Sequence, residues 1–133
     1  EATRLIFVMQ DKLIEKEYAA AKLYFDLGTY FGTSSSSSSG NNYEACVVTA
    51  QNAISDFPYS ERREDFAILI VRAKFELAEQ SVESKKVERF QNAIDEYHGF
   101  VNEYPKSKFL PKATSLYNRA KAFLAKPQNA AQS

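Results

Sequence analysis

Apolar side chains recur in the first part of the chain with the spacing of an α-helix. The steps are four, three and four residues, through Ile14, Tyr18, Ala21 and Phe25. This period gives a helix one wide buried face, and Gly28 stands where a helix C-cap is expected. No useful length of sequence alternates with the period of two that a half-buried strand shows. The pattern therefore predicts an all-α chain.

The helical period continues after this segment. Apolar residues over 43–57 have the same spacing and predict a second helix. Pro58 is expected to end this helix, because the residue before a proline is pushed away from helical geometry. Three more segments show the same period and predict helices over 61–82, 86–104 and 109–125.

Two parts of the chain match each other at a constant offset of 47 residues. "YEACVVTAQNAISDFPYS" (43–60) aligns with "FQNAIDEYHGFVNEYPKS" (90–107), and "RAKFELA" (72–78) aligns with "RAKAFLA" (119–125). One offset that holds in two separate helices indicates a repeated unit of helix A, loop, helix B and an aromatic-proline turn.

The B helices resemble those of the tetratricopeptide repeat (TPR). An aromatic residue is followed three positions on by a small residue, then by small or aromatic residues and a proline. The two sets are Tyr43, Cys46, Ala50, Ala53, Pro58 and Phe90, Ala93, Tyr97, Phe100, Pro105. The resemblance implies about five antiparallel helices in the order A-B-A-B-A, forming a short right-handed solenoid in which each helix pair stacks on its neighbours.

These assignments predict one TPR-like domain over 1–126, followed by a disordered tail over 127–133. Residues 29–42 contain "SSSSSS" and are expected to form a flexible loop inside the first hairpin, natural or engineered. A contact loop and a modification site are the alternatives for this segment. Deletion of 33–40 is expected to leave helicity and melting temperature intact or slightly raised.

The opening residues suggest where the chain stands in the repeat. "EATRL" (1–5) echoes "KATSL" (112–116), which follows a proline turn. We therefore expect the chain to start at a helix A, with earlier repeats missing from it.

Charge and composition argue against several classes of function. Seventeen basic and seventeen acidic residues give zero formal charge, which does not favour nucleic-acid binding. One cysteine excludes an internal disulfide. No segment looks like a signal peptide or has the roughly 18 apolar residues of a membrane span.

Candidate catalytic or metal-binding groups are few. His98 is the only histidine, with Asp95 and Glu103 near it in sequence, and is interpreted as a solvated or groove-facing residue of a B helix. Cys46 occupies the small buried position of the repeat and is interpreted as structural. No zinc spacing, phosphate loop, dinucleotide fingerprint or nucleophile elbow is present. We therefore expect no enzyme activity, no metal and no cofactor.

The A helices carry a second candidate feature, a ladder of charged side chains. Lys22, Arg72 and Arg119 fall at equivalent positions, and four residues later stand Asp26, Glu76 and Phe123. One interpretation is that Lys22–Asp26 and Arg72–Glu76 are simple i,i+4 ion pairs. The other is that the ladder binds an acidic strip on a partner protein. Peptide clamps of the chaperone-adaptor type are disfavoured because 13–28 and 61–78 contain no asparagine.

The order of these segments resembles the C-terminal half of the BamD lipoprotein family, in particular its Bacteroidetes branch. The resemblance lies in "QDKLIEKEYAAAKLYFDLG" (10–28), "NNYEACVVTAQNAISDFPYSE" (41–61) and "RAKFELAEQSVESKKVERFQNAIDEYHGFVNEYPKSK" (72–108). It implies a non-catalytic scaffold of the outer-membrane β-barrel assembly machinery, held by a lipid anchor at the periplasmic face of the outer membrane. The lipidated cysteine would lie in a missing N-terminal part.

The same resemblance implies a protein partner, the periplasmic POTRA region of a barrel assembly protein, with no nucleic acid and no membrane insertion by this segment. Two alternatives remain open. One is another cell-envelope TPR adaptor, such as a coordinator of cell division or a peptidoglycan-associated protein. The other is the helical-repeat domain of a larger envelope hydrolase.

Overall fold

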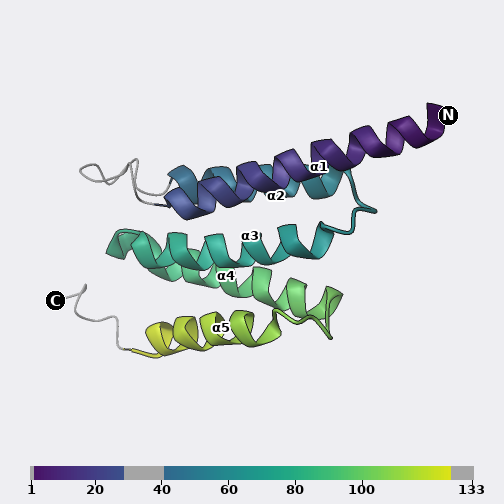
Figure 1. Cartoon of the computed structure of the whole chain (residues 1–133). Helices are drawn as coiled ribbons and strands as arrows, with labels where there is room; N and C mark the ends of the chain where they lie inside the picture. The colour runs from purple at the N-terminus through teal and green to yellow at the C-terminus, as the bar shows by residue number, and fades with distance from the viewer. Residues whose placement is uncertain (1, 29–40, 127–133) are drawn as a thin grey trace.

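The computed structural model describes residues 2–28 and 41–126. Within them the chain is entirely helical and contains no strand, which confirms the predicted all-α class. The five helices are α1 (Ala2–Leu27), α2 (Asn41–Asp56), α3 (Arg63–Gln80), α4 (Glu83–Glu103) and α5 (Leu110–Ala125). Successive helices run antiparallel, in a row from α1 and α2 through α3 and α4 to α5 (Figure 1).

Several helix boundaries differ from the predicted ones by two or three residues, and the third helix is two residues shorter at each end than predicted. The first helix begins at Ala2, near the start of the chain, where a helix was expected. The second begins at Asn41, so the two asparagines assigned to the loop belong to the helix. The fourth begins at Glu83, three residues before the predicted start. The predictions for 29–40 and 127–133 lie outside the described residues.

α3 is the central element, because both of its long sides are buried. One side packs with α1 and α2 around a first core, and the other side packs with α4 and α5 around a second core. Phe66, Leu69, Ile70 and Ala73 belong to the first core, and Ile68, Val71, Phe75 and Ala78 belong to the second. An apolar face this wide explains why α3 tolerates so few charged positions in its middle.

The turns after α2 and α4 have the same hydrogen bonds. The hydroxyl oxygen of Ser60 accepts the backbone N–H of Arg62 at 2.9 Å, and that of Ser107 accepts the N–H of Phe109 at 3.0 Å. Each serine N–H also donates to the carbonyl of the aromatic residue three positions earlier, Phe57 or Tyr104. The repeat seen in the sequence is therefore also a repeat of local structure, and the described architecture is compatible with a helical array.

α1 ends through a close approach to the start of α2. Gly28 has φ +45°, the left-handed conformation that closes many helices. A Cβ atom at this position would lie 2.5 Å from the Tyr43 hydroxyl oxygen. The Asn42 side chain donates to the Gly28 carbonyl at 2.8 Å. Only glycine therefore fits both the backbone conformation and the space here.

The first half of α1 extends past the rest of the molecule (Figure 1), and every side chain over 2–13 is exposed. The match of 1–5 with 112–116 does not extend to burial. Leu5 is 60% exposed, whereas its counterpart Leu116 is 2% exposed.

Candidate protein-binding surfaces

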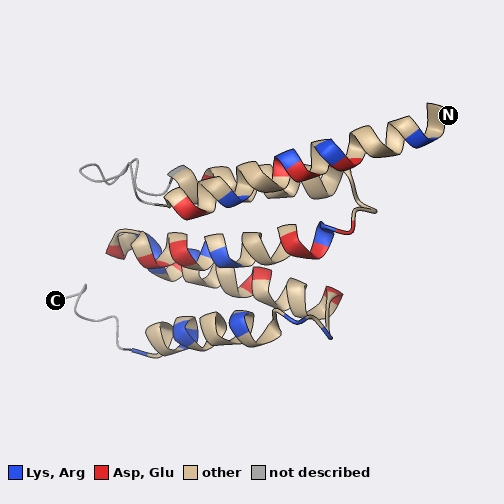
Figure 2. Cartoon of the chain, in the orientation of Figure 1, with Lys and Arg blue, Asp and Glu red and all other residues tan. Residues whose placement is uncertain are grey.

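Three A helices, α1, α3 and α5, present the charged side chains singled out from the sequence. Figure 2 shows positions of both signs along α1 and α3, whereas the charged residues of α5 are all basic: Lys112, Arg119 and Lys121. We name the group that includes the predicted ladder and its contacts the A-helix strip. It consists of Lys22, Phe25, Asp26, Arg72, Glu76, Glu79 and Arg119.

Neighbouring members of the strip contact one another within and between helices. Lys22 Nζ lies 3.0 Å from an Asp26 carboxylate oxygen, the i,i+4 pair expected from the sequence. The Arg72 guanidinium lies over the Phe25 ring, 4.5 Å from its centroid, and joins α3 to α1. Arg119 forms an ion pair with Glu79 at 2.5 Å and joins α5 to α3. All three predicted cations therefore have contacts inside the chain.

Several charges of the strip lie near two buried residues of α2, Cys46 and Tyr43. Burial raises the pKa of the Cys46 thiol to about 12, and the charges that modify it are Arg72, Asp26 and Lys22. Burial also raises the pKa of Tyr43, and the carboxylates of Glu76 and Glu79 raise it further. α2 therefore lies behind the part of the strip on α1 and α3 and supplies an apolar backing there.

Partly exposed ion pairs of this kind stabilise a fold only weakly, by about 0–1 kcal/mol. Half of the Arg119 and Lys22 side-chain surface is exposed, at 51% and 43%. Losing either ion pair within the chain would therefore change the free energy of unfolding little. The strip thus presents partly exposed charges of both signs on α1 and α3, whereas the charged residues of α5 are basic.

Cys46 and His98 lie where their sequence context predicted. Cys46 is fully buried, as expected for the small position of the repeat. His98 is exposed on α4, with its ring 5.3 Å from the Tyr97 and Tyr117 rings. In the described part of the chain, no group of three or more His, Cys, Asp or Glu side chains is placed to hold a metal ion.

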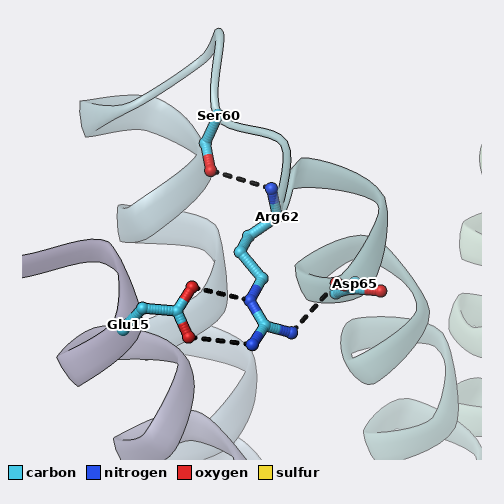
Figure 3. A network of polar contacts seen from close by, with 4 residues as sticks. All are labelled: Glu15, Ser60, Arg62 and Asp65. Atoms are coloured by element: carbon cyan, nitrogen blue, oxygen red, sulfur yellow. Dashed lines mark hydrogen bonds and ion pairs between the residues drawn. The ribbon is translucent and has the colours of Figure 1, made fainter. Parts of the chain in front are cut away.

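A second polar network links α1 to the turn between α2 and α3 (Figure 3). Arg62 donates two hydrogen bonds to the Glu15 carboxylate, at 2.9 and 2.8 Å, and one to Asp65 at 3.1 Å. The same guanidinium lies 4.2 Å from the centroid of the Tyr18 ring. The hydrogen bond from Arg62 lowers the pKa of the Glu15 carboxyl group.

A cavity of about 680 Å³ opens beside this network, between the first half of α1 and the turn. Its lining has three aromatic residues, Phe7, Phe57 and Tyr59. It also has more acidic than basic residues, because Arg62 is the only cation and the acids are Asp11, Glu15, Asp56, Glu61 and Asp65. Tyr59 is 98% exposed. The cavity is an open surface feature rather than an enclosed pocket.

The sequence interpretation did not identify the Phe25–Arg72, Glu79–Arg119 and Glu15–Arg62 contacts. Each joins segments that are distant in sequence, so spacing within one helix gave no sign of it. The 47-residue offset gave a partial indication of the contact between α3 and α5, because it placed Arg72 and Arg119 at equivalent positions of these two helices.

Within 2–28 and 41–126, no helix is both long and apolar enough to cross a membrane. No protein-family model matches the chain. No curated protein is similar enough in sequence to count as a relative.

Proposed function

We propose that the chain is a non-catalytic protein-protein interaction scaffold with a TPR-like architecture. The observation that carries the proposal is the A-helix strip, which extends over α1, α3 and α5 through the Phe25–Arg72 and Glu79–Arg119 contacts. Repeated helix pairs form extended surfaces of this kind for binding other proteins. The identical turns at Ser60 and Ser107 support the repeat on which the architecture rests.

Within this class, the favoured role is that of the C-terminal part of a BamD-like lipoprotein in outer-membrane β-barrel assembly. The support is the sequence resemblance over 10–125, in which the order of the segments is more specific than any one motif. The partner would be a periplasmic POTRA domain of the barrel subunit, and the location would be the periplasmic face of the outer membrane. The basic face of α5 would meet an acidic segment of that domain.

The alternatives differ in what the full-length protein carries outside this chain. A lipidated cysteine near the N-terminus of the full-length protein supports the assembly role. A catalytic domain after Ser133 would instead support a helical-repeat domain of an envelope hydrolase. Another envelope adaptor would bind a different partner through the same strip.

The test is a pull-down of a POTRA-containing protein with the variant Arg72→Glu/Arg119→Glu. The matched control is Lys85→Glu/Lys106→Glu, which changes the net charge equally at exposed positions outside both the strip and α5. Circular dichroism verifies that both variants are folded. We expect the first variant to lose binding at least tenfold and the control to keep it. Equal binding by the two variants would exclude the strip as the contact.

A further inference from the structure

The face of α1 that packs on the core continues past the end of α2. Phe7 and Asp11 precede Ile14 and Tyr18 at steps of four, three and four residues, which is the spacing of one helix face. Ile14 is buried in the first core at 7% exposure. α2 ends at Asp56, and the α1 face lies open at Asp11 and Phe7 (Figure 1). The cavity of about 680 Å³ therefore continues an existing interface between helices.

Two aromatic rings of this cavity have most of their surface in solvent. Tyr59, in the turn, is 98% exposed, and Phe7, on α1, is 61% exposed. The cavity volume lies within the range of ligand-binding clefts, about 300–1,000 Å³. Exposed aromatic side chains beside such a cleft are typical of interaction sites.

The charges of the cavity favour one kind of partner. Its only cation, Arg62, is already bound by Glu15 and Asp65 (Figure 3). The remaining carboxylates, all exposed, are those of Asp11, Asp56 and Glu61. None of these three forms an ion pair within 2–28 and 41–126. The cavity therefore has uncompensated negative charge, which is complementary to a cationic segment.

Arg62 shows how this region holds a guanidinium group. It donates to both carboxylate oxygens of Glu15 and lies 4.2 Å from the centroid of the Tyr18 ring. Carboxylates and aromatic rings together favour arginine, because its planar group forms paired hydrogen bonds and stacks on rings. The cavity has the same two kinds of group again: carboxylates without a cation, and the exposed rings of Tyr59 and Phe7.

The second turn shows that the fold does not require this composition. It has the same serine hydrogen bonds as the first turn. At the 47-residue offset, Tyr59, Glu61 and Asp65 correspond to Lys106, Lys108 and Lys112. The cavity beside the second turn is lined by Lys106 and Lys108, with Glu64 as its only acid. Because one turn geometry occurs with opposite charges, the acidic and aromatic residues of the first turn are not needed to form it.

We propose that the cavity beside the first turn binds an arginine-rich segment of a partner protein. An arginine side chain of that segment enters between α1 and the turn, lies against the rings of Tyr59 and Phe7, and pairs with the carboxylate of Asp11 or Glu61. The segment covers the part of the α1 face that α2 leaves open. The cavity shares no residue with the A-helix strip, so the two surfaces can be tested separately.

The first test is the fluorescence anisotropy of a labelled hexa-arginine peptide titrated with the chain. Asp11→Asn/Glu61→Gln is compared with Glu88→Gln/Asp95→Asn, which removes the same charge at exposed positions of α4. We expect the first variant to weaken binding about fivefold and the second by less than about twofold. A hexa-glutamate peptide should not bind. Absence of hexa-arginine binding at about 1 mM chain, or equal effects of the two variants, would overturn the proposal.

The second test examines the aromatic rings with the same peptide. Phe7→Ala is matched by Leu5→Ala, because Leu5 is 60% exposed on the same helix and does not line the cavity. Phe7→Ala and Tyr59→Ala should each weaken binding about threefold, whereas Leu5→Ala should not change it. Circular dichroism verifies that all three variants are folded. Equal binding by Phe7→Ala and Leu5→Ala would contradict binding in the cavity.

Sedimentation equilibrium of the chain alone tests the other occupant, the basic second turn of another copy. We expect a monomer of 15.1 kDa. A dimer that is lost in Lys106→Glu/Lys108→Glu would assign the cavity to a second copy and would also overturn the proposal.

Discussion

Arg62 in the turn before α3 binds both carboxylate oxygens of Glu15 in α1, and the two residues are 47 positions apart in the sequence. The bidentate geometry fixes the rotation of α1 relative to the turn. Because Arg62 also lies over the Tyr18 ring, one side chain holds the middle of α1 to the turn before α3.

We predict that Arg62→Ala lowers the free energy of unfolding by about 1 kcal/mol, from one ion-pair network and one cation–π contact at a partly exposed site. Glu15→Gln should lower it less, since the ring contact remains. Urea denaturation monitored by circular dichroism measures both effects. The control is Lys12→Ala, an exposed position on the same helix. If Lys12→Ala costs as much as Arg62→Ala, the network does not secure α1.

The low pKa of Glu15 gives this network a pH dependence. A carboxyl group whose pKa is lower in the folded state stabilises the fold above its unfolded value of 4.5, and this contribution is lost as the pH falls. The stability difference between the parent chain and Glu15→Gln should therefore shrink below pH 4.5. Urea midpoints measured on either side of that pH show this change, and a constant difference would contradict it.

The α3 core is expected to respond strongly to truncation. Phe66 is fully buried, with its ring 5.6 Å from the Tyr18 ring in an edge-on contact. Phe66→Ala should cost about 3–5 kcal/mol, because it leaves a cavity where α1, α2 and α3 meet. Tyr59→Ala is the matched control, since this aromatic residue is 98% exposed, and should change stability by less than about 0.5 kcal/mol. Calorimetry of both variants checks the difference.

Two glycines should respond to alanine in opposite directions. Gly28→Ala combines a positive φ with a Cβ atom 2.5 Å from the Tyr43 hydroxyl oxygen and should destabilise by about 2 kcal/mol. Gly99 lies inside α4 with nothing within 4 Å of an added Cβ, so Gly99→Ala should stabilise by about 0.5–1 kcal/mol. Thermal melts of the two variants test the pair. A gain in stability for Gly28→Ala would contradict the described close approach.

The sequence predicted those features that depend on spacing within one helix. The buried positions Ile14, Ala21 and Cys46 and the Lys22–Asp26 pair are of this kind. Contacts such as Glu15–Arg62 or Glu79–Arg119 depend on how packed helices are rotated, which no local pattern specifies. Residues 2–13 have no buried face, so a helix at the start of the chain was expected only from the match of 1–5 with 112–116.

Cys46 provides a test of how tightly the first core is closed. Burial raises the pKa of its thiol from 9.0 to about 12, so the folded state keeps a proton that the unfolded state releases. Its contribution to stability is therefore complete below pH 9 and is lost as the pH rises toward 12. Cys46→Ala should flatten the decline of the urea midpoint above pH 9, although Tyr43 adds a decline of the same sign at higher pH.

The same thiol should react with Ellman's reagent at least about 100-fold more slowly in the folded chain than in urea, because the thiolate is the nucleophile and is scarce in the core. Phe66→Ala, which opens the same core, should speed the reaction, whereas Tyr59→Ala should not. A thiol that reacts at the same rate in the folded chain and in urea would mean that the packing of α2 against α1 and α3 opens readily in solution.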